Sequence, residues 1–275
     1  MGDCYGIMAS WTLDDIPWAS FDAALVDPDI LRIVKAASLV EGNGSDYAQY
    51  LCGIFHDDLE FHAIALRWGE EEVQHGRALG RWAALADPGF DFETAKARFT
   101  KNFRVDLGAD SSSRGSRAGE MVARCVVETG TSSYYSALAE AAREPVLREL
   151  CRRIAADEFR HYRLFLGLVR RYDPMNRLGL IGRLRIVFQR VRESEDDELA
   201  LAYHTANGGS EPYDRLSSVK AYSNRAYRLY RRHHVERVAA MILKTMGLPA
   251  SGKLGQMVSG IAWWLIQSRV KPEAA

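Results

Sequence analysis

Apolar residues recur at helical spacings along most of this 275-residue chain. In segments 31–39 and 146–154, leucine, valine and isoleucine are spaced so that they gather on one face of a helix. Runs that alternate between apolar and polar residues with period two are few, and clusters of β-branched residues are rare. The pattern therefore predicts an all-α fold.

Helix-breaking and capping residues divide the first half of this pattern into two long helices. The segment "VDPD", residues 26–29, precedes the first helix. Asp57 with Glu60 matches a capping box that opens the second. The segment "DPGFD", residues 87–91, is expected to end this second helix near Asp87.

The second half of the chain predicts two more long helices. The polar segment "LGADSSSRGSRAG", residues 107–119, is expected to be the linker before the third helix. Pro145 suits the first turn of the fourth helix. The segment "YDPMNRLG", residues 172–179, is expected to close it near Asp173. Shorter helices follow towards the C-terminus.

No predicted linker is long or flexible enough to demand a second domain. We therefore predict a single domain over residues 1–275, with a helical core at about 28–175 and accessory C-terminal helices at about 176–272. With 47% hydrophobic and 26% charged residues, the composition is that of a soluble globular protein with a sizeable core.

The sequence also favours a cytoplasmic location. It contains no run of eighteen uncharged apolar residues, and its first residues lack the basic-then-apolar order of a secretory signal. No C-x-x-C pair occurs, and buried free thiols in a reducing compartment are favoured over disulfides for Cys4, Cys52, Cys125 and Cys151.

The formal net charge of zero conceals two halves of opposite charge. Residues 1–142 contain 12 Lys and Arg against 22 Asp and Glu, whereas residues 143–275 contain 24 against 14. The basic half is therefore suited to an acidic partner, but the two halves could equally neutralise each other on folding. We expect no nucleic-acid partner.

Two segments contain Glu-x-x-His. They are "EEVQH", which holds Glu72 and His75, and "EFRH", which holds Glu158 and His161. Residues three apart on a helix share a face, so each pair can direct a carboxylate and an imidazole at one point. One such pair is weak evidence, because chance alone can supply a match in a chain with 7 His.

The positions of two further glutamates strengthen the prediction. Glu41 lies 31 residues before Glu72, and Glu128 lies 30 residues before Glu158, with a predicted turn midway in each interval. At 1.5 Å per residue, about 15 residues out and 15 back return the second glutamate to the height of the first. Two such hairpins would bring four Glu and two His to one level of a four-helix bundle.

This set of side chains predicts a site for two metal ions. A lone Glu from each of two helices, with Glu-x-x-His from each of the other two, is the pattern of carboxylate-bridged bundles. Four carboxylates in an apolar core would repel one another strongly without cations. Oxygen ligands with two imidazoles favour iron or manganese over zinc. The alternative is six ordinary charged positions on amphipathic helix surfaces.

Two acidic neighbours of the motifs have a further possible role. Asp157 precedes Glu158 and Glu71 precedes Glu72, so each is turned about 100° aside on its helix. There each carboxylate could accept the second ring N–H of a ligand histidine from a neighbouring helix. We favour this role for Asp157, whereas a solvent-facing position is an equal alternative for Glu71.

With these residues in view, the sequence resembles the soluble acyl-carrier-protein desaturases of the ferritin-like superfamily. The segments "EEVQHG" and "IAADEFRH" are similar to the two metal motifs of that family. "ETGT" matches its E-x-x-T, with Glu128 as ligand and Thr131 as the hydroxyl, and "EGNGSDY" places Glu41 six residues before Tyr47. The resemblance covers residues 30–175 well and a later stretch, 213–246, more loosely.

The resemblance implies a ferritin-like four-helix bundle with additional C-terminal helices and two iron ions per chain. Glu41 and His75 would bind one iron and Glu128 and His161 the other, with Glu72 and Glu158 bridging. With O₂ as co-substrate, such an enzyme inserts a double bond into an acyl chain. The implied partners are an acidic acyl carrier protein that holds the substrate, a ferredoxin-like electron donor and a second copy of the chain.

The sequence departs from the family in several places. Phe159 stands where the family usually has Lys, and fewer residues precede the first helix than in plant members. Gly42 and Gly44 follow Glu41, where they either leave room for oxygen or substrate or break the helix. Thr131, with Gly130 before it, either donates a proton to bound oxygen or bonds back to the carbonyl at position 127.

Three C-terminal segments have open interpretations. The basic segments 182–192 and 225–237 could contact a carrier protein or anionic lipid, or could be solvated helix faces. His233 and His234 are adjacent, so a helix directs them differently and they make a poor metal pair. Segment 259–270 contains two tryptophans suited to a membrane interface, although packing on the bundle or on a dimer partner is favoured.

Three other functions share parts of this pattern. A hydroxylase, an N-oxygenase or a decarboxylating enzyme would use the same ligands and differ in channel shape. A ferritin-like iron store would have fewer residues after the bundle. A scaffold that has lost catalysis would bind no stoichiometric metal.

Overall fold

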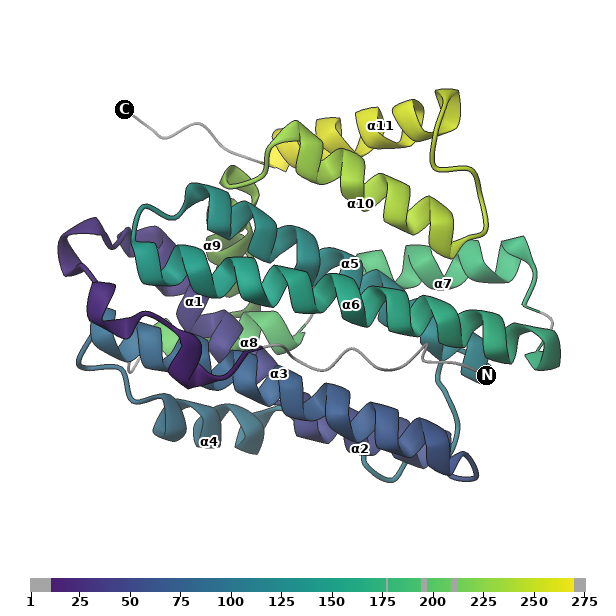
Figure 1. Cartoon of the computed structure of the whole chain (residues 1–275), viewed down its shortest axis with the longest axis horizontal. Coiled ribbons are helices and arrows are strands. Elements are labelled where there is room, and N and C mark those ends of the chain that lie inside the picture. The colour runs from purple at the N-terminus through teal and green to yellow at the C-terminus, as the bar shows by residue number, and fades with distance from the viewer. Residues whose placement is uncertain (1–10, 177, 194–196, 209–211, 270–275) are drawn as a thin grey trace.

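The computed structural model describes residues 11–176, 178–193, 197–208 and 212–269. Within these ranges the secondary structure is helical, without β-strands, which confirms the predicted all-α fold (Figure 1). Three short 3-10 turns come first, at Leu13–Asp15, Trp18–Ser20 and Ala23–Leu25. The α-helices are α1 (Pro28–Glu41), α2 (Gly44–Ile54), α3 (Leu59–Ala86), α4 (Phe92–Asn102), α5 (Arg117–Ala141), α6 (Pro145–Asn176), α7 (Leu180–Arg192), α8 (Asp197–Asn207), α9 (Arg215–Arg228), α10 (Arg232–Thr245) and α11 (Lys253–Arg269).

Two helical hairpins form the bundle. The first consists of α1 and α2, which together run alongside α3, and the second consists of α5 and α6. A long connection that contains α4 joins the hairpins, which is the topology of ferritin-like bundles. Both turns lie where the intervals between the glutamates placed them, at 55–58 and 142–144.

Helix α6, the second helix of the second hairpin, begins at a buried carboxylate. Glu144 accepts hydrogen bonds from the backbone N–H groups of Val146 and Leu147, at 3.2 and 2.7 Å, and therefore caps α6. It also accepts a 2.7 Å bond from the indole N–H of Trp82 on α3. This side chain thus ties the start of α6 to the neighbouring hairpin.

Three predicted helix boundaries are wrong by one to three residues, and one of them is the start of α5 at Arg117, inside the linker predicted over 107–119. The cap of α3 is Asp58, whose carboxylate accepts from the N–H of Phe61 at 2.9 Å, whereas Asp57 pairs with Arg117. Helix α6 does not close near Asp173 but continues through Pro174 to residue 176. The packing of the buried Tyr172 ring, whose hydroxyl bonds to Asp58 at 2.6 Å, holds this last turn against α3.

The first long helix is interrupted beside its glutamate. Helix α1 ends at Glu41 and α2 begins at Gly44, so of the two explanations for the glycines the helix break is the one found. A Cβ atom on Gly44 would lie 2.3 Å from the Cβ of Glu72, and one on Gly76 would lie 2.4 Å from the backbone nitrogen of Gly42. The glycines thus let the α1–α2 junction approach the backbone of α3.

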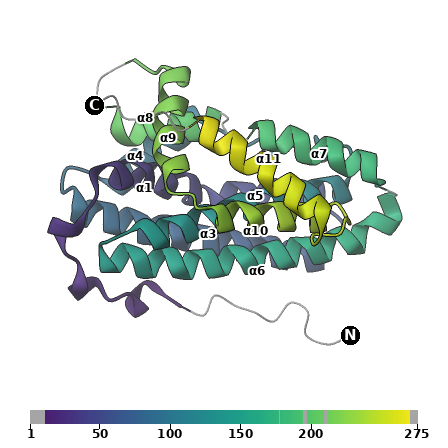
Figure 2. The ribbon, with the colours of Figure 1, turned by 90° about the horizontal axis from the view of Figure 1, so that it is seen from above.

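The C-terminal helices cover one side of the bundle. Helices α7 and α10 pack on α5, α8 packs on α1, α9 lies on α8 and α1, and α11 lies on α10 (Figures 1 and 2). Helix α11 is only partly covered, since Trp264 is 66% exposed. Helix α7 likewise presents an apolar stripe to solvent, which includes Ile181 and Phe188.

Among the described residues, no helix combines the length and the apolar character needed to cross a bilayer. The cysteines in this part of the chain, Cys52, Cys125 and Cys151, are free thiols, whereas Cys4 lies outside it.

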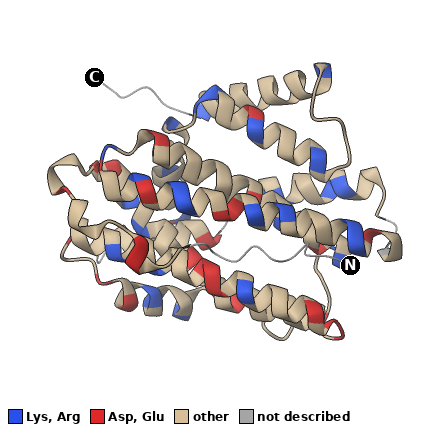
Figure 3. Ribbon diagram, viewed as in Figure 1, with Lys and Arg blue, Asp and Glu red and all other residues tan. Residues whose placement is uncertain are grey.

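Some charges of the two sequence halves meet in the fold. Arg160 and Arg171 on α6 pair with acidic residues of α3 and its cap, and Arg225 pairs with Asp29. Arginines remain along α6, α7 and α10, and acidic residues cluster midway along α3 (Figure 3). Folding therefore neutralises part of the charge asymmetry and leaves arginines on α6 of the bundle and on the accessory helices α7 and α10.

Candidate metal centre

Four helices direct ligand-type side chains to one level of the bundle. They fall into two overlapping groups whose donor atoms lie within 4.8 Å of one another. One group contains Glu41, Glu72, His75 and Glu158, and the other contains Glu72, Glu128, Glu158 and His161. The structure therefore brings together all six side chains singled out in the sequence, and Glu72 and Glu158 belong to both groups. Each of the six is at most 7% exposed.

Apolar packing on both sides holds this polar level in place. One cluster of buried residues includes Leu39, Leu79 and Leu138, and a second includes Leu51, Phe61 and Phe165. Along each bundle helix the change from one cluster to the other occurs at the ligand-type residues. The carboxylates thus lie in the middle of the core, where solvation by bulk water is lost.

The two histidines are oriented by carboxylates from each other's motif. His75 Nε2 lies 3.0 Å from Asp157 Oδ2, and His161 Nε2 lies 2.8 Å from Glu71 Oε2. An imidazole that donates Nε2–H to such a carboxylate keeps its lone pair on Nδ1. Both Nδ1 atoms point into the cluster: His75 Nδ1 is 3.3 Å from Glu158 Oε1, and His161 Nδ1 is 3.0 Å from Glu72 Oε1.

When both rings are neutral, this arrangement places lone pairs against lone pairs. Five buried atoms have no hydrogen-bond partner in the described part of the chain: Glu72 Oε1, His75 Nδ1, Glu128 Oε1, Glu158 Oε1 and His161 Nδ1. All belong to the six side chains, and an unsatisfied buried polar group is costly. Cations between the two groups would satisfy all five atoms, so the donor set fits two divalent metal ions.

The protonation of the cluster supports the same conclusion. Burial, reinforced by repulsion from Glu72, raises the pKa of Glu41 well above its usual value, and burial with repulsion from Glu158 does the same for Glu128. Burial lowers the pKa of each histidine, but the surrounding carboxylates outweigh it and raise the pKa of His75 and His161. The cluster therefore holds protons unless metal cations replace them.

Two hydroxyl groups touch the carboxylates directly. Tyr135 donates a hydrogen bond to Glu41 Oε1 at 2.6 Å. Thr131 Oγ1 lies 2.5 Å from Glu158 Oε2 and 3.3 Å from the carbonyl oxygens of Val127 and Glu128. Thr131 thus contacts both the cluster and the carbonyl groups of its own helix, and its contact to Glu158 is the shorter one.

Asp157 is held from several sides. The indole N–H of Trp11 donates to its Oδ2 at 2.8 Å, and Arg160 pairs with its Oδ1. Arg160 also reaches Glu71 Oε2 at 3.4 Å, so one guanidinium bridges the two carboxylates that orient the histidines. Trp11 in addition stacks on the His75 ring, with centroids 6.0 Å apart.

Sequence reasoning missed Tyr135, Trp11 and Arg124. Tyr135 lies seven residues after Glu128 and Arg124 four before it, so the periodicity of α5 could have placed both on the ligand face. Trp11 comes from the irregular N-terminal segment, where periodicity gives no such signal.

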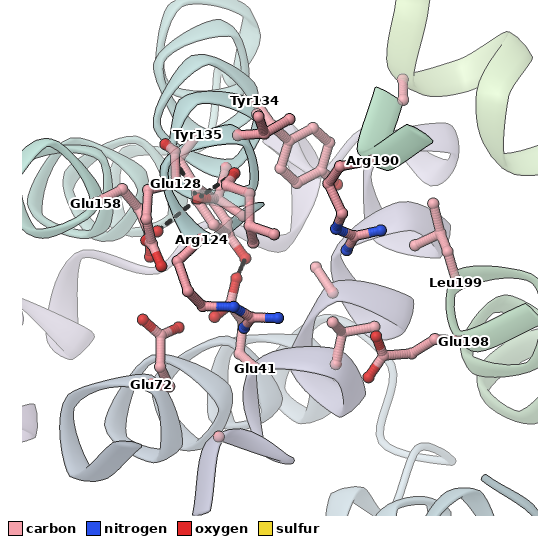
Figure 4. A pocket seen from close by; sticks show the side chains of 18 of the residues that line it. Glu41, Glu72, Arg124, Glu128, Tyr134, Tyr135, Glu158, Arg190, Glu198 and Leu199 are labelled. Atoms are coloured by element: carbon pink, nitrogen blue, oxygen red, sulfur yellow. Dashed lines mark hydrogen bonds between the residues drawn. The ribbon is translucent and has the colours of Figure 1, made fainter. Parts of the chain in front are cut away.

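A pocket opens beside the carboxylates (Figure 4). It has a volume of about 330 Å³ and extends from Glu41, Glu72, Glu128 and Glu158 to the accessory helices α7, α8 and α9. Apart from these carboxylates its walls are mostly apolar and aromatic, including Val127, Tyr134, Leu199 and Tyr222. Gly130 also lines it, and a Cβ atom on this glycine would meet nothing within 4 Å.

A second group of possible ligands lies on the surface. Glu140 Oε2 is 3.3 Å from His233 Nε2 and 3.1 Å from His234 Nε2. The Nδ1 atom of His234 accepts the backbone N–H of Arg231 at 3.0 Å, so the neutral ring carries its proton on Nε2 and donates it to Glu140. This geometry suits a hydrogen bond to Glu140. The sequence-based expectation that a helix directs the two rings differently is wrong, because both rings reach Glu140 and their centroids lie 4.0 Å apart.

Neither a scan against protein-family models nor a search of curated proteins finds a match to this chain. Among solved structures, a variant of an R2-like ligand-binding oxidase with an aerobically reconstituted Fe/Fe cofactor is similar at 14% identity and a TM-score of 0.44. The overlap covers 95% of this chain and 89% of the oxidase. At this level of similarity the cofactor of that oxidase says nothing about this chain. The metal site is inferred from the side chains of this chain alone.

Proposed function

We propose that this protein binds two iron ions between its six buried ligands and uses O₂ to oxidise a C–H bond of an apolar, acyl-type substrate. The observation that carries the proposal is the set of five unsatisfied donor atoms that face one another beside a largely apolar pocket. The buried carboxylates need cations to neutralise their charge. The adjoining pocket can hold a substrate, which favours catalysis over iron storage alone.

The donor set favours iron or manganese over zinc. The four carboxylates are hard ligands and the two imidazoles are of intermediate hardness, and such a set suits iron or manganese. The set includes none of the thiolates that structural zinc sites prefer. Glu41 and His75 would hold one ion and Glu128 and His161 the other, with Glu72 and Glu158 shared. When bound, the reduced pair supplies the electrons that activate O₂.

The chain's own residues have distinct roles in such a reaction. The Thr131 hydroxyl, whose Oγ1 lies 2.5 Å from Glu158 Oε2, holds a proton at the pocket wall beside Gly130. Tyr135 fixes one oxygen of Glu41, and the Asp157 and Glu71 carboxylates fix both histidine rings. The apolar pocket wall would exclude water and hold the substrate chain against this level.

A desaturase is the finer form of this proposal. In that reaction two vicinal hydrogens leave the chain, O₂ is reduced to two water molecules, and an external donor supplies two electrons with two protons. The support is the resemblance of the motifs, together with a basic surface suited to an acidic carrier protein and a ferredoxin-like donor. Helix α7 contributes to that surface, because it carries four arginines and no acidic residue.

Hydroxylation and iron storage are the rivals. A hydroxylase would use the same donor and return one oxygen atom in the product. A store would take up more than two iron ions per chain and would leave acyl substrates unchanged.

Metal content tests the site first. Protein reconstituted with ferrous iron under argon should bind two ions per chain, and Glu128→Ala should lose at least one. Glu140→Ala is the matched control, because Glu140 lies on the same helix at the surface and should leave the content unchanged. Unchanged iron in Glu128→Ala would remove Glu128 from the site.

Turnover tests the reaction. Chemically reduced, iron-loaded protein should consume O₂ and convert an acyl substrate to a product two daltons lighter if it desaturates, or sixteen heavier if it hydroxylates. Mineralised iron without a modified substrate would instead establish the storage function.

A further inference from the structure

A buried arginine faces the pocket one helical turn from the metal ligands. Arg124 lies on α5 four residues before Glu128, and only 8% of it is exposed. Its side chain lines the pocket, and Figure 4 shows its guanidinium turned towards the space in front of the carboxylates. A guanidinium cannot lose its charge in a protein, so this cation is permanent.

The protein itself satisfies this cation incompletely. Among the described residues none accepts a hydrogen bond from the buried Nε, and the nearest carboxylate oxygen, Glu120 Oε1, is 3.8 Å away. That separation is too long for a hydrogen bond. Glu120 Oε2 instead accepts from Ser112 at 2.7 Å and from Tyr50 at 3.3 Å.

Aromatic rings hold the guanidinium in place. The Arg124 Cζ atom lies 5.2 Å from the ring centroid of Tyr47 and 5.9 Å from that of Trp68. Tyr47 is fixed in turn by a 2.6 Å hydrogen bond to Glu198. Such contacts orient a guanidinium without consuming its N–H donors, which remain available for a planar anion.

We propose that Arg124 binds the carboxylate of a free organic acid whose apolar body lies across the metal centre. This inference rests on the proposed oxidase function, and it specifies a free acid as the substrate in place of the carrier-bound acyl chain of the desaturase form. A carboxylate matches the paired donors of a guanidinium, whereas an acyl chain bound to a carrier as a thioester brings no anion to this position. Arg190 of α7 also lines the pocket, but it pairs with Glu193 at 3.8 Å, and the Glu198 carboxylate lies on the same accessory-helix side.

The face of α5 sets the orientation of the substrate. Arg124, Glu128, Thr131 and Tyr134 follow one another along the pocket side of this helix. With 1.5 Å per residue, Glu128 lies about 6 Å and Tyr134 about 15 Å along the axis from Arg124. The carboxylate end would therefore lie near the metal level, and the apolar body would extend past Thr131 towards Tyr134 and Tyr222.

Binding of a matched pair of probes tests the inference. Iron-loaded protein under argon is titrated by calorimetry with decanoate and with decan-1-ol, which share the apolar tail and differ in charge. We expect decanoate to bind about ten- to a hundredfold more tightly than decan-1-ol. Arg124→Gln should remove most of this preference for decanoate. Arg124→Lys should retain part of it, and Arg232→Gln, at an exposed position of α10, should leave it unchanged.

Several outcomes would overturn the assignment. Equal binding of the two probes to the unaltered protein would do so without any variant. A preference that persists in Arg124→Gln, with normal iron content, would place the carboxylate elsewhere, for instance on the metal. If Arg124 only balances the charge of the core, Arg124→Gln should lower the melting temperature and leave the probe ratio unchanged.

A failure of the oxidase function can be distinguished from a failure of the Arg124 assignment. If decanoate binds through Arg124 but is not oxidised on addition of O₂ and reductant, the anchor stands and the proposed function fails. If decanoyl carrier protein is oxidised while decanoate neither binds nor competes, the oxidase stands and the anchor is wrong.

Discussion

Asp157 Oδ2 lies 3.0 Å from His75 Nε2, so the residue that precedes the second Glu-x-x-His motif orients the histidine of the first. Glu71 and His161 repeat the relationship in reverse at 2.8 Å. The two motifs therefore interlock across α3 and α6. Each supplies two ligand-type side chains and the carboxylate that fixes the ring of the other.

This interlocking predicts a large effect from small changes. Asp157→Asn and Glu71→Gln keep the size of each side chain but weaken the hold on the ring and its tautomer. We expect each to lower metal affinity about 10- to 100-fold, as measured by competition with a chelator. Glu70→Gln is the control, since Glu70 is exposed beside Glu71. An affinity unchanged in both variants would mean that neither carboxylate orients a ligand.

Metal removal should make stability depend on pH in an unusual direction. The pKa values of Glu41 and Glu128 are raised in the folded chain, so their protonated forms favour folding at acidic pH. That contribution is complete below the unfolded pKa and is lost as the pH rises through the folded pKa. Bound metal replaces the protons and removes this loss.

The gap in melting temperature between metal-loaded and metal-free protein should therefore widen from acidic to neutral pH. Metal-free protein that carries both Glu41→Gln and Glu128→Gln should show a flatter dependence, since neither amide titrates. A gap that is constant with pH would contradict the raised pKa values.

Two glycines near the site should differ in how well they tolerate substitution by alanine. In Gly44→Ala the new Cβ would collide with the Cβ of Glu72, which belongs to a long helix and cannot yield easily. We expect a loss of about 1–3 kcal/mol in unfolding free energy and weaker metal binding. Gly130→Ala meets open space and should fold normally, while it narrows the pocket and raises KM. Equal stability of the two variants in denaturant titrations would refute the close approach.

Thr131 can be tested by separating its hydroxyl from its shape. Thr131→Val removes the donor 2.5 Å from Glu158 Oε2, and Thr131→Ser keeps it. We expect the valine variant to retain two iron ions and to consume O₂. The amount of oxidised product formed per O₂ consumed should fall by about 10²-fold if the hydroxyl acts in proton transfer. The serine variant should remain close to the unaltered protein. If the valine variant forms as much product per O₂ consumed as the unaltered protein, the role of Thr131 is packing and not proton transfer.

Glu144 should be important for stability although it lies outside the metal site. Its carboxylate caps α6 and accepts the indole N–H of Trp82, and it is 1% exposed. Glu144→Ala should cost about 2–4 kcal/mol in unfolding free energy, because a cap is lost and a buried N–H is left unsatisfied. Asp91→Ala, at the exposed cap of α4, should cost only about 1 kcal/mol in the same denaturant titration.

Periodicity along the chain was sufficient to predict the bundle and the level of the site. The intervals from Glu41 to Glu72 and from Glu128 to Glu158 place helical residues at equal heights, because rise per residue is fixed by backbone geometry. Glu-x-x-His spacing follows from the same geometry. A helix break at Gly42 and Gly44 was predicted only as one of two alternatives, and contacts with α3 decided between them. The one-residue shift of the α3 cap was not predictable from periodicity, since it depends on a pairing with Arg117.

The sequence by itself determined which side chains share a helix face, because local geometry repeats with every turn. Only the tertiary structure decided that Trp11 reaches Asp157, that Arg160 bridges the carboxylates of both motifs, and that Arg124 faces a pocket closed by α7 to α9. These contacts join residues far apart in the chain. They depend on how the helices pack, and no periodic pattern within one helix encodes that packing.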